Sequence, residues 1–426
     1  MRRDLLLHKT EQLTKTVRLL NAKSRRTATL FPWLDDLKAR QLRQLAQETG
    51  LHKTADKAGI INGLEKALAQ FQQDHEQEKA LRVGKGKLKE RRILSIDMGI
   101  QNFAFAILGV DIVDPGPMGP QSFLDQKKKV RMLAWHKVSL PFDHGFSPEE
   151  FGQHLDEVGP LSVPPPRDPA AFSTSVSDHE PHFGFSSTSG PPEDGERQKN
   201  DRSSQKRSFS LPVYATHAHS IIITLLDRYK PTHVLIERQR FRSGSCASVL
   251  EWTLRVGVFE GMIWTALHAL QQQKKQGPKV IAMDPAKVAT FWIPPSTSTS
   301  SSSSSNPDPD PEPAPQTPGR KVTRPDKKRF KVDLVGSWLE KDIFQIRGRS
   351  LVQRWVDAYK EKWKKPSGWK KKRSKYAPDP PPVEGVTVAN IGKLDDLADC
   401  LVQGMTWLEW ERMKESVLRE GAKALK

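Results

Sequence analysis

The strongest constraint on the fold is a single carboxylate inside an apolar stretch, ILSIDMGIQNFAFAIL at residues 93–108. The stretch predicts two strands, and their short link favours antiparallel neighbours. Asp97 ends the first strand, where a charge taken out of water is costly unless it has a partner. The apolar run HVLIE at 233–237 repeats the arrangement with Glu237. Both carboxylates therefore need an explanation beyond packing.

The order of the other periodic segments predicts an α/β fold. A third strand, an apolar helix, the strand that carries Glu237, a long helix, a short fifth strand and further helices follow one another along the chain. Their ranges are 130–140, 217–229, 233–237, 248–273, 280–285, 327–341 and 394–413. We therefore expect one mixed five-stranded sheet flanked by helices, in a domain that spans 93–412.

Three segments interrupt this domain with compositions that do not favour packing. Residues 141–210 and 294–320 are rich in Pro, Ser and Asp, and the third gap, 342–390, has a basic, proline-rich part from about 362 to 390. Such segments bury too little apolar area to offset their ordering entropy. We expect disordered insertions that emerge as surface loops.

The N-terminal region divides into three parts. Residues 1–32 resemble an amphipathic organellar transit peptide, although Asp4 and Glu11 are atypical of one, and a basic helix or DNA-binding arm fits as well. Residues 33–70 predict two short amphipathic helices joined through Gly50 and a polar connector. This pattern resembles a SAP-type module, which docks on duplex DNA, and a plain helical hairpin is the alternative. Residues 71–92 are a charged linker.

Charge and composition restrict the partners. The formal net charge is +18, which favours a polyanion such as nucleic acid. Two distant cysteines, Cys246 and Cys400, provide neither a disulfide framework nor a zinc pattern. The sequence shows no apolar run near the ~20 residues that span a bilayer, and no phosphate-binding loop or nucleophile signature. We expect no membrane partner and no small-molecule cofactor.

A group of aspartates opens the last predicted helix. Asp399 shares a helix face with Asp395 (i, i+4) and with Asp396 (i, i+3). Together with Asp97 and Glu237, these carboxylates can converge at one edge of the sheet and then require a cation. Hard oxygen ligands favour Mg²⁺, for which Mn²⁺ can substitute, and such sites support phosphodiester hydrolysis. Taken singly, an aspartate at a strand end or a helix start is typical of a turn or a cap.

Several motifs together resemble one known family, the fungal mitochondrial Holliday junction resolvases. These are relatives of bacterial RuvC within the RNase H-like superfamily. The motifs are SIDMGIQNFAFAIL, LIERQRFRS, MDPAKVATFW, KKRFKVDLVGSWL and KLDDLADCLVQGMTWLEW. The likeness covers about 93–140, 211–293, 321–341 and 391–412, and the family also carries a SAP-like module before the catalytic domain.

The resemblance implies a function and a set of residues. It implies Mg²⁺-dependent cleavage of four-way DNA junctions by paired nicks, in a mitochondrial homodimer. The catalytic metal ligands would be Asp97, Glu237 and Asp399, with one or both of Asp395 and Asp396. Gln101, Asn102, Gln239 and Arg242 lie where the family approaches DNA. Lys327, Lys328 and Arg329 are further candidates for phosphate contacts. Helix 248–273 is a candidate dimer contact or, alternatively, a helix buried within the chain.

Other functions remain compatible with parts of the pattern. The DxGxxN start at Asp97 also begins actin-like ATPases, which need a second glycine-rich phosphate loop that the sequence does not show. A non-catalytic DNA-binding protein would share the charge and the SAP-like module. A nuclease of the same fold that cuts RNA/DNA hybrids is separable only by its substrate.

Overall fold

The computed structural model describes most of the predicted elements. The described residues are 30–84, 90–99, 102–111, 122–141, 144–156, 210–239, 251–273, 277–293, 324–346, 351–365 and 391–425. The basic N-terminal segment up to residue 29 and most of the predicted insertions lie outside these ranges. In the described part of the chain, no helix has the length and apolar character needed to cross a membrane.

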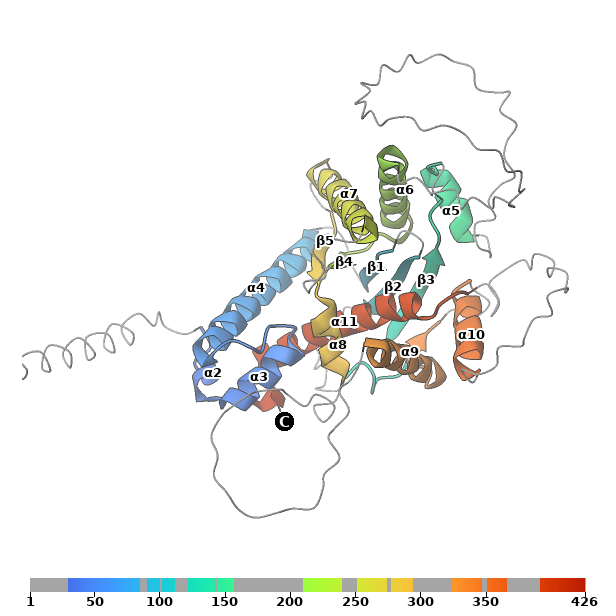
Figure 1. Ribbon diagram of the computed structural model, residues 1–426. Helices are drawn as coiled ribbons and strands as arrows, with labels where there is room; N and C mark the ends of the chain where they lie inside the picture. The colour runs from blue at the N-terminus through green and yellow to red at the C-terminus, as the bar shows by residue number, and fades with distance from the viewer. Residues whose placement is uncertain are drawn as a thin grey trace, which may run out of the picture.

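A mixed sheet forms the centre of the larger domain (Figure 1). Its strand order is β5-β4-β1-β2-β3-β6. β1 pairs antiparallel with β2 and parallel with β4, β2 pairs antiparallel with β3, and β5 and β6 add parallel edges. The strands span Glu90–Asp97, Phe103–Asp111, Val130–Val138, His233–Glu237, Lys279–Met283 and Phe344–Gln345. β1 and β2 are apolar on both faces, so both faces of the sheet must be covered by helices.

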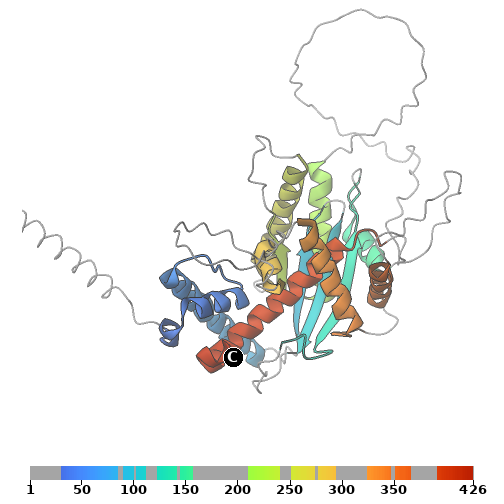
Figure 2. The same cartoon turned by 60° about the horizontal axis from the view of Figure 1, so that its bottom comes forward.

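Helices cover the two faces of the sheet in two groups (Figure 2). α8, α9, α10 and α11 pack over the face that carries Ile93, Ala106 and Leu235. α5, α6 and α7 pack over the face that carries Leu94, Phe105 and Ile236. The helices span Pro148–Asp156 (α5), Leu211–Tyr229 (α6), Glu251–Gln273 (α7), Pro285–Trp292 (α8), Arg324–Glu340 (α9), Leu351–Lys364 (α10) and Asp395–Glu420 (α11).

α11 lies close against the sheet because of a glycine. A side chain at Gly404 would bring a Cβ within 2.8 Å of Leu108 and 3.4 Å of Ser95. Ser95 Oγ donates a hydrogen bond to the carbonyl of Cys400 at 2.7 Å. At the first turn of the helix, Trp135 Nε1 of β3 donates a hydrogen bond to the carbonyl of Leu397 at 3.0 Å. The start of α11 is thereby fixed over β1 and β3.

A small helical module sits beside β5. It consists of α2 (Trp33–Asp36), α3 (Ala39–Glu48) and α4 (Lys57–Gly84), which share a core around Leu42 and Leu64. Met413 and Val417 of α11 belong to the same core, and the closing 3-10 helix η3 (Gly421–Leu425) packs on it. α11 therefore crosses the sheet and ends inside the module (Figure 1).

The structure differs from the sequence expectations in several elements. The sheet has a sixth strand, because the two residues of β6 pair with the start of β3. The expected insertion 141–210 contains α5, whose Phe151 and Leu155 are buried against α6. The gap 342–390 contains β6 and α10, which buries Trp355 and Tyr359. The linker 71–92, expected to be helical or extended, is helical up to Gly84, but β1 begins at Glu90, before the expected start at Ile93.

Candidate active site

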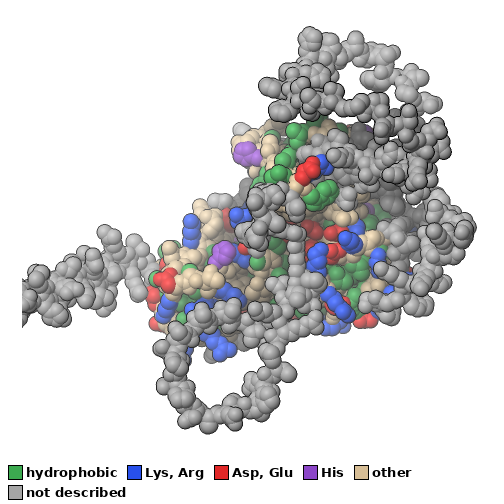
Figure 3. Space-filling view, in the orientation of Figure 1, with side chains coloured by type: hydrophobic (Ala, Val, Ile, Leu, Met, Phe, Trp, Pro, Cys, Tyr) green, Lys and Arg blue, Asp and Glu red, His purple; other side chains and the backbone are tan. Residues whose placement is uncertain are grey.

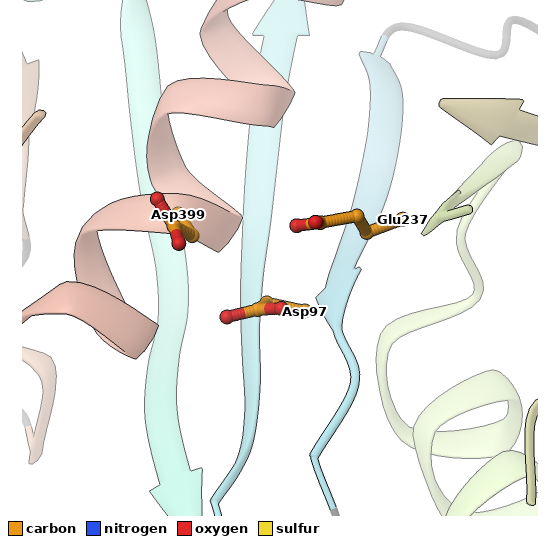
Figure 4. A group of neighbouring side chains, drawn as sticks. All are labelled: Asp97, Glu237 and Asp399. Carbon is orange, nitrogen blue, oxygen red and sulfur yellow. The ribbon is translucent and has the colours of Figure 1, made fainter. Parts of the chain in front are cut away.

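Two carboxylates lie side by side at one edge of the sheet. β1 and β4 are parallel neighbours, and Ile96 is paired with Ile236. Asp97 and Glu237 are the next residues on the two strands, so they end their strands at the same level. Because side chains alternate along a strand, both project to the face covered by α11. Figure 4 shows the two carboxylates reaching the same space from β1 and β4.

α11 brings the third carboxylate over these strand ends. Gln403, which is buried, donates from Nε2 to the carbonyl of Ile96 at 3.1 Å and to Ser95 Oγ at 3.1 Å. The same amide lies 3.4 Å from the carbonyl of Leu235 on β4. One side chain thus ties the helix to both strands that end in a carboxylate. Asp399 lies one turn before Gln403, on the same side of the helix.

The three carboxylates form a compact group in which their negative charges repel one another. One oxygen each of Asp97, Glu237 and Asp399 lies within 4.8 Å of the other two. Burial raises the pKa of Asp97 well above its usual value, and the charges of Glu237 and Asp399 raise it further. Burial also raises the pKa of Asp399, although Lys331 opposes the shift. Binding of a proton or a cation would therefore lower the electrostatic free energy of the group.

Lysines from α9 and β3 surround the carboxylates. Lys331 Nζ lies 2.7 Å from Asp399 Oδ1, in an ion pair with both side chains largely buried. Lys328, one turn earlier on α9, donates to Asp395 Oδ2 at 2.5 Å. From β3, Lys137 donates to the carbonyl of Lys393 at 2.8 Å. In Figure 3, acidic and basic side chains lie side by side near the centre of the visible face.

The arrangement fits a divalent cation. Asp399 Oδ1 is buried, and among the described residues the ammonium of Lys331 lies beside it at 2.7 Å, which leaves the oxygen a further lone pair. An oxygen with a free lone pair, two more carboxylates within ligand distance of a common point, and hard donor atoms are the features that Mg²⁺ and Mn²⁺ prefer. Of the described residues, Asp97, Glu237 and Asp399 are the ones that could hold the ion.

The two ambiguous aspartates differ in their surroundings. Asp396 acts electrostatically on Asp97, and burial together with Asp395 raises the pKa of Asp396. Burial acts to raise the pKa of Asp395 as well, but the hydrogen bond and charge of Lys328 outweigh it and the pKa is lowered. Asp395 is thus paired with Lys328 of α9, whereas Asp396 lies 3.5 Å from Lys137 of β3 and also acts electrostatically on Asp97.

The predicted DNA contacts are only partly described. Gln239 Nε2 lies 3.4 Å from the carbonyl of Met98, so it bridges the ends of β4 and β1 beside the carboxylates. Asn102 is partly buried in the turn before β2. Arg329 is exposed and lies 3.7 Å from Asp333 on the outer side of α9. Gln101 and Arg242 lie outside the described residues, as does the side chain of Lys327.

Sequence reasoning missed Lys331 and Gln403. Both left a signal. Lys331 follows Lys328 by three residues, a spacing that puts both on one side of a helix. Gln403 is a polar residue four places after Asp399 in an otherwise apolar stretch. Neither signal identifies the carboxylates as their partners, because those contacts join distant parts of the chain.

The sheet order and the carboxylates at the ends of β1 and β4 and on the last helix define an RNase H-like α/β protein. Within that class, the chain belongs to the family described as mitochondrial resolvase Ydc2 / RNA splicing MRS1, whose model matches residues 93–417.

Two curated relatives carry the same name, cruciform cutting endonuclease 1, mitochondrial. The protein of Schizosaccharomyces pombe is 39% identical over 74 residues, which cover 16% of this chain and 28% of that protein. The protein of Saccharomyces cerevisiae is 22% identical over 386 residues, which cover 88% of this chain and 84% of that protein.

Two solved structures were also matched. The yeast mitochondrial Holliday junction resolvase Ydc2 has a TM-score of 0.43 at 16% identity, over 91% of this chain and 98% of that one. Thermus thermophilus RuvC in complex with a Holliday junction substrate has a TM-score of 0.21 at 13% identity, over 47% and 68% of the two chains.

Proposed function

We propose that this chain is a divalent-metal-dependent endonuclease that resolves four-way DNA junctions by paired nicks. The observation that carries the proposal is the half-buried group of Asp97, Glu237 and Asp399, with one oxygen of each within 4.8 Å of the others in a chain of net charge +18. Membership of the resolvase family and the names of the two relatives support the junction as the substrate.

The chain's residues hold and orient the reacting groups. Asp97 and Glu237 sit on rigid strand ends, and Gln403 fixes α11 so that Asp399 faces them. Mg²⁺, or Mn²⁺ in its place, would activate the attacking water and stabilise the leaving oxygen. Water attacks the phosphorus and gives up a proton to solvent, the bond from phosphorus to the sugar oxygen breaks, and that oxygen takes up a proton from solvent to leave as a hydroxyl. No covalent bond to the chain forms.

Asp396 is the proposed fourth carboxylate. It acts on Asp97 and is only loosely paired with Lys137 at 3.5 Å, whereas Asp395 is held by Lys328 at 2.5 Å. Lys331 keeps positive charge beside Asp399 and steadies the group before the metal binds. In this assignment Asp395 serves to position α9 on α11.

DNA contacts are proposed on the polar and basic side chains around the carboxylates. Gln239 and Asn102 lie at the ends of strands next to Asp97, where a scissile strand would pass. Lys328 and Arg329 on α9 would contact phosphates, and Gln101, Arg242 and Lys327 remain candidates from the sequence. The SAP-like module of residues 33–70 would hold duplex DNA.

A homodimer in the mitochondrion completes the proposal. Two nicks related by the two-fold axis of a junction need two sites in the same relation. One side of α7 is buried through Phe259 and Ile263, and Leu254 and Val258 lie exposed on the opposite side near its start. This exposed side is the proposed dimer contact. The mitochondrial location rests on the names of the relatives.

Cleavage of a synthetic four-way junction in Mg²⁺ tests the proposal. Wild type should nick strands symmetrically, with less cutting of linear duplex and of an RNA/DNA hybrid. Asp97→Asn should bind the junction without cutting. Asp357→Asn, which removes an exposed carboxylate on α10, is the matched control and should cut normally. Junction binding without cleavage by wild type would leave a non-catalytic DNA-binding protein.

A second candidate is binding of structured RNA, because the family description also names RNA splicing. It predicts tight binding of a folded RNA by wild type and by Asp97→Asn alike, with no cleavage of either nucleic acid. Measuring both ligands with the same protein preparations separates the two functions.

A further inference from the structure

The helical module is fixed to the catalytic domain by direct contacts. Gln47 of α3 donates from Nε2 to the carbonyl of Thr290 on α8 at 2.9 Å. Lys287, also on α8, donates from Nζ to the carbonyl of Gly50 at 3.1 Å. Trp410 of α11 packs so tightly on Gly50 that a Cβ there would lie 2.5 Å from its ring. The module is therefore packed directly against α8 and α11.

Basic side chains gather along this contact. Arg43 and Arg40 lie one and two turns before Gln47, so they continue the stripe of α3 that meets α8. Lys53 donates to Gln47 Oε1 at 3.0 Å, which brings its ammonium to the same stripe. We call Arg40, Arg43, Lys53 and Lys287 the module seam. Arg40, Arg43 and Lys53 are exposed, and neither arginine forms an ion pair with a described carboxylate. Figure 3 shows Lys and Arg side chains on the surface of the module.

α8 and α11 connect the carboxylates to the helical module that bears the seam, and the length of α11 limits how far apart they lie. At its near end, Met283 of β5 is paired with Glu237, and α8 with Lys287 follows directly. At the far end, α11 runs from Asp399 to Val417 in the module core. Eighteen residues of helix between them correspond to about 27 Å at 1.5 Å per residue. At 3.4 Å per base pair, that length is about eight base pairs of duplex.

We propose that the module seam is a duplex-binding surface that grips the phosphates of one junction arm within about eight base pairs of the cleaved bond. The inference rests on the proposed function and adds where, and how rigidly, the arm is held. Arginine suits this task because its planar fork of donors matches phosphate oxygens. Such contacts set the register of the arm without reading its sequence. The arm and the acidic site then move as one body.

The proposal is tested by removing the arginine charges from the protein and, separately, the phosphate charges from the DNA. The full chain carries Asp97→Asn, so that it binds without cutting, and is compared with and without Arg40→Gln/Arg43→Gln. The matched control is Lys341→Gln/Arg354→Gln, which removes the same charge from two exposed positions, one in the turn just after α9 and one on α10. The DNA is a four-way junction with uncharged methylphosphonate linkages in all four arms, placed either 3–8 or 12–17 base pairs from the centre.

We expect the effects of the arginine substitutions and of the near methylphosphonates on junction affinity to be non-additive. Arg40→Gln/Arg43→Gln should weaken binding of the unmodified junction about tenfold near 0.1 M salt and flatten the salt dependence by about two phosphate contacts. The near methylphosphonates should weaken the parent protein and the control, but add little to the loss in the arginine variant. The far methylphosphonates should change nothing.

Two results would overturn the inference. Equal binding by the arginine variant and its parent would show that the module seam does not hold DNA. Additive losses with the near methylphosphonates would place the arginines on other phosphates. Cleavage of the unmodified junction by the wild-type protein is measured alongside. If wild type cuts the junction and either of these two results is found, this inference alone is overturned. If the protein neither binds nor cuts the junction, the proposed function is overturned as well.

Discussion

The ammonium of Lys331 lies 2.7 Å from Oδ1 of Asp399, with only 14% and 17% of the two side chains exposed. Burial acts to lower the pKa of Lys331, but Asp399, Glu237 and Asp97 together raise it, so the lysine stays charged. α9 thus supplies a fixed positive charge to a group of carboxylates borne by β1, β4 and α11.

Lys331→Gln should destabilise the metal-free protein because three carboxylates then face one another without a cation. We expect a loss of about 2 kcal/mol, smaller than for an isolated buried pair since the carboxylates can take up a proton. That corresponds to a melting temperature lower by about 4–8 °C. Saturating Mg²⁺ should restore much of the difference, because the ion neutralises the same oxygens.

Thermal unfolding with EDTA and with Mg²⁺ measures both effects for Lys331. Lys331→Arg is the control and should stay near wild type, because it keeps the charge. A Lys331→Gln protein that melts like wild type in EDTA would contradict the role of the ion pair.

Asp97→Asn should separate binding from cutting. The substitution removes one carboxylate from the group of three while the amide keeps the shape of the side chain. We expect junction affinity within about threefold of wild type and cleavage reduced by at least about 10³-fold, since the ion loses a ligand at the reacting centre. Single-turnover cleavage and gel-shift titration on the same junction provide the two numbers. Residual cutting near the wild-type rate would place the chemistry elsewhere.

Asp97 and Glu237 could be predicted from the sequence for a local reason. Each ends an apolar strand, and parallel strands bring their ends to one edge of a sheet. Asp399 could also be predicted, because helical spacing puts it on the same face of the last helix as Asp395 and Asp396. The sheet was largely predictable too, since β1 to β5 are long enough to show their apolar character. β6 has two residues and no pattern of its own.

The contacts of Lys331 and the place of the module could not be predicted, because they depend on packing between distant segments. Residues 33–70 look like a self-contained hairpin, yet Met413 and Val417 from the end of the chain complete their core. Similarly, α10 lies in a segment that looked like an insertion, and its Tyr359 is buried beside Trp135 of β3.

The stabilising effect of removing Asp97 should depend on pH in the absence of metal. Burial, Glu237 and Asp399 raise the pKa of Asp97 in the folded state. A raised carboxyl pKa means that the folded state is favoured while the group is protonated and loses that stability as pH rises through the folded pKa. Asp97→Asn mimics the protonated form.

The melting temperatures of Asp97→Asn and wild type in EDTA should therefore coincide below about pH 4, where the carboxyl is protonated in both states. Towards neutral pH the variant should become the more stable protein, by about 2–4 °C for each kcal/mol. Adding Mg²⁺ at neutral pH should reverse the order, because only wild type offers the full ligand set. A difference that does not change with pH would mean that Asp97 keeps its ordinary pKa.

Gln403 should matter for cleavage more than for folding alone. Its amide donates to the carbonyl of Ile96 and lies near that of Leu235, so it sets the height of α11 above both carboxylate-bearing strands. Gln403→Leu leaves those acceptors without their buried donor, at a cost of about 1–3 kcal/mol. The helix can then shift, and a displacement of about 1 Å at Asp399 lowers the rate by about 10²-fold.

Ser416→Ala provides the matched control for Gln403. It alters a buried polar residue of the same helix at the module end, where Ser416 Oγ has no hydrogen-bond partner among the described residues. We expect its melting temperature and its cleavage rate to stay near wild type. Single-turnover cleavage at saturating protein, below the melting temperature of each variant, isolates the positioning effect. A Gln403→Leu protein that melts earlier but cuts a bound junction at the wild-type rate would reduce this residue to a packing role.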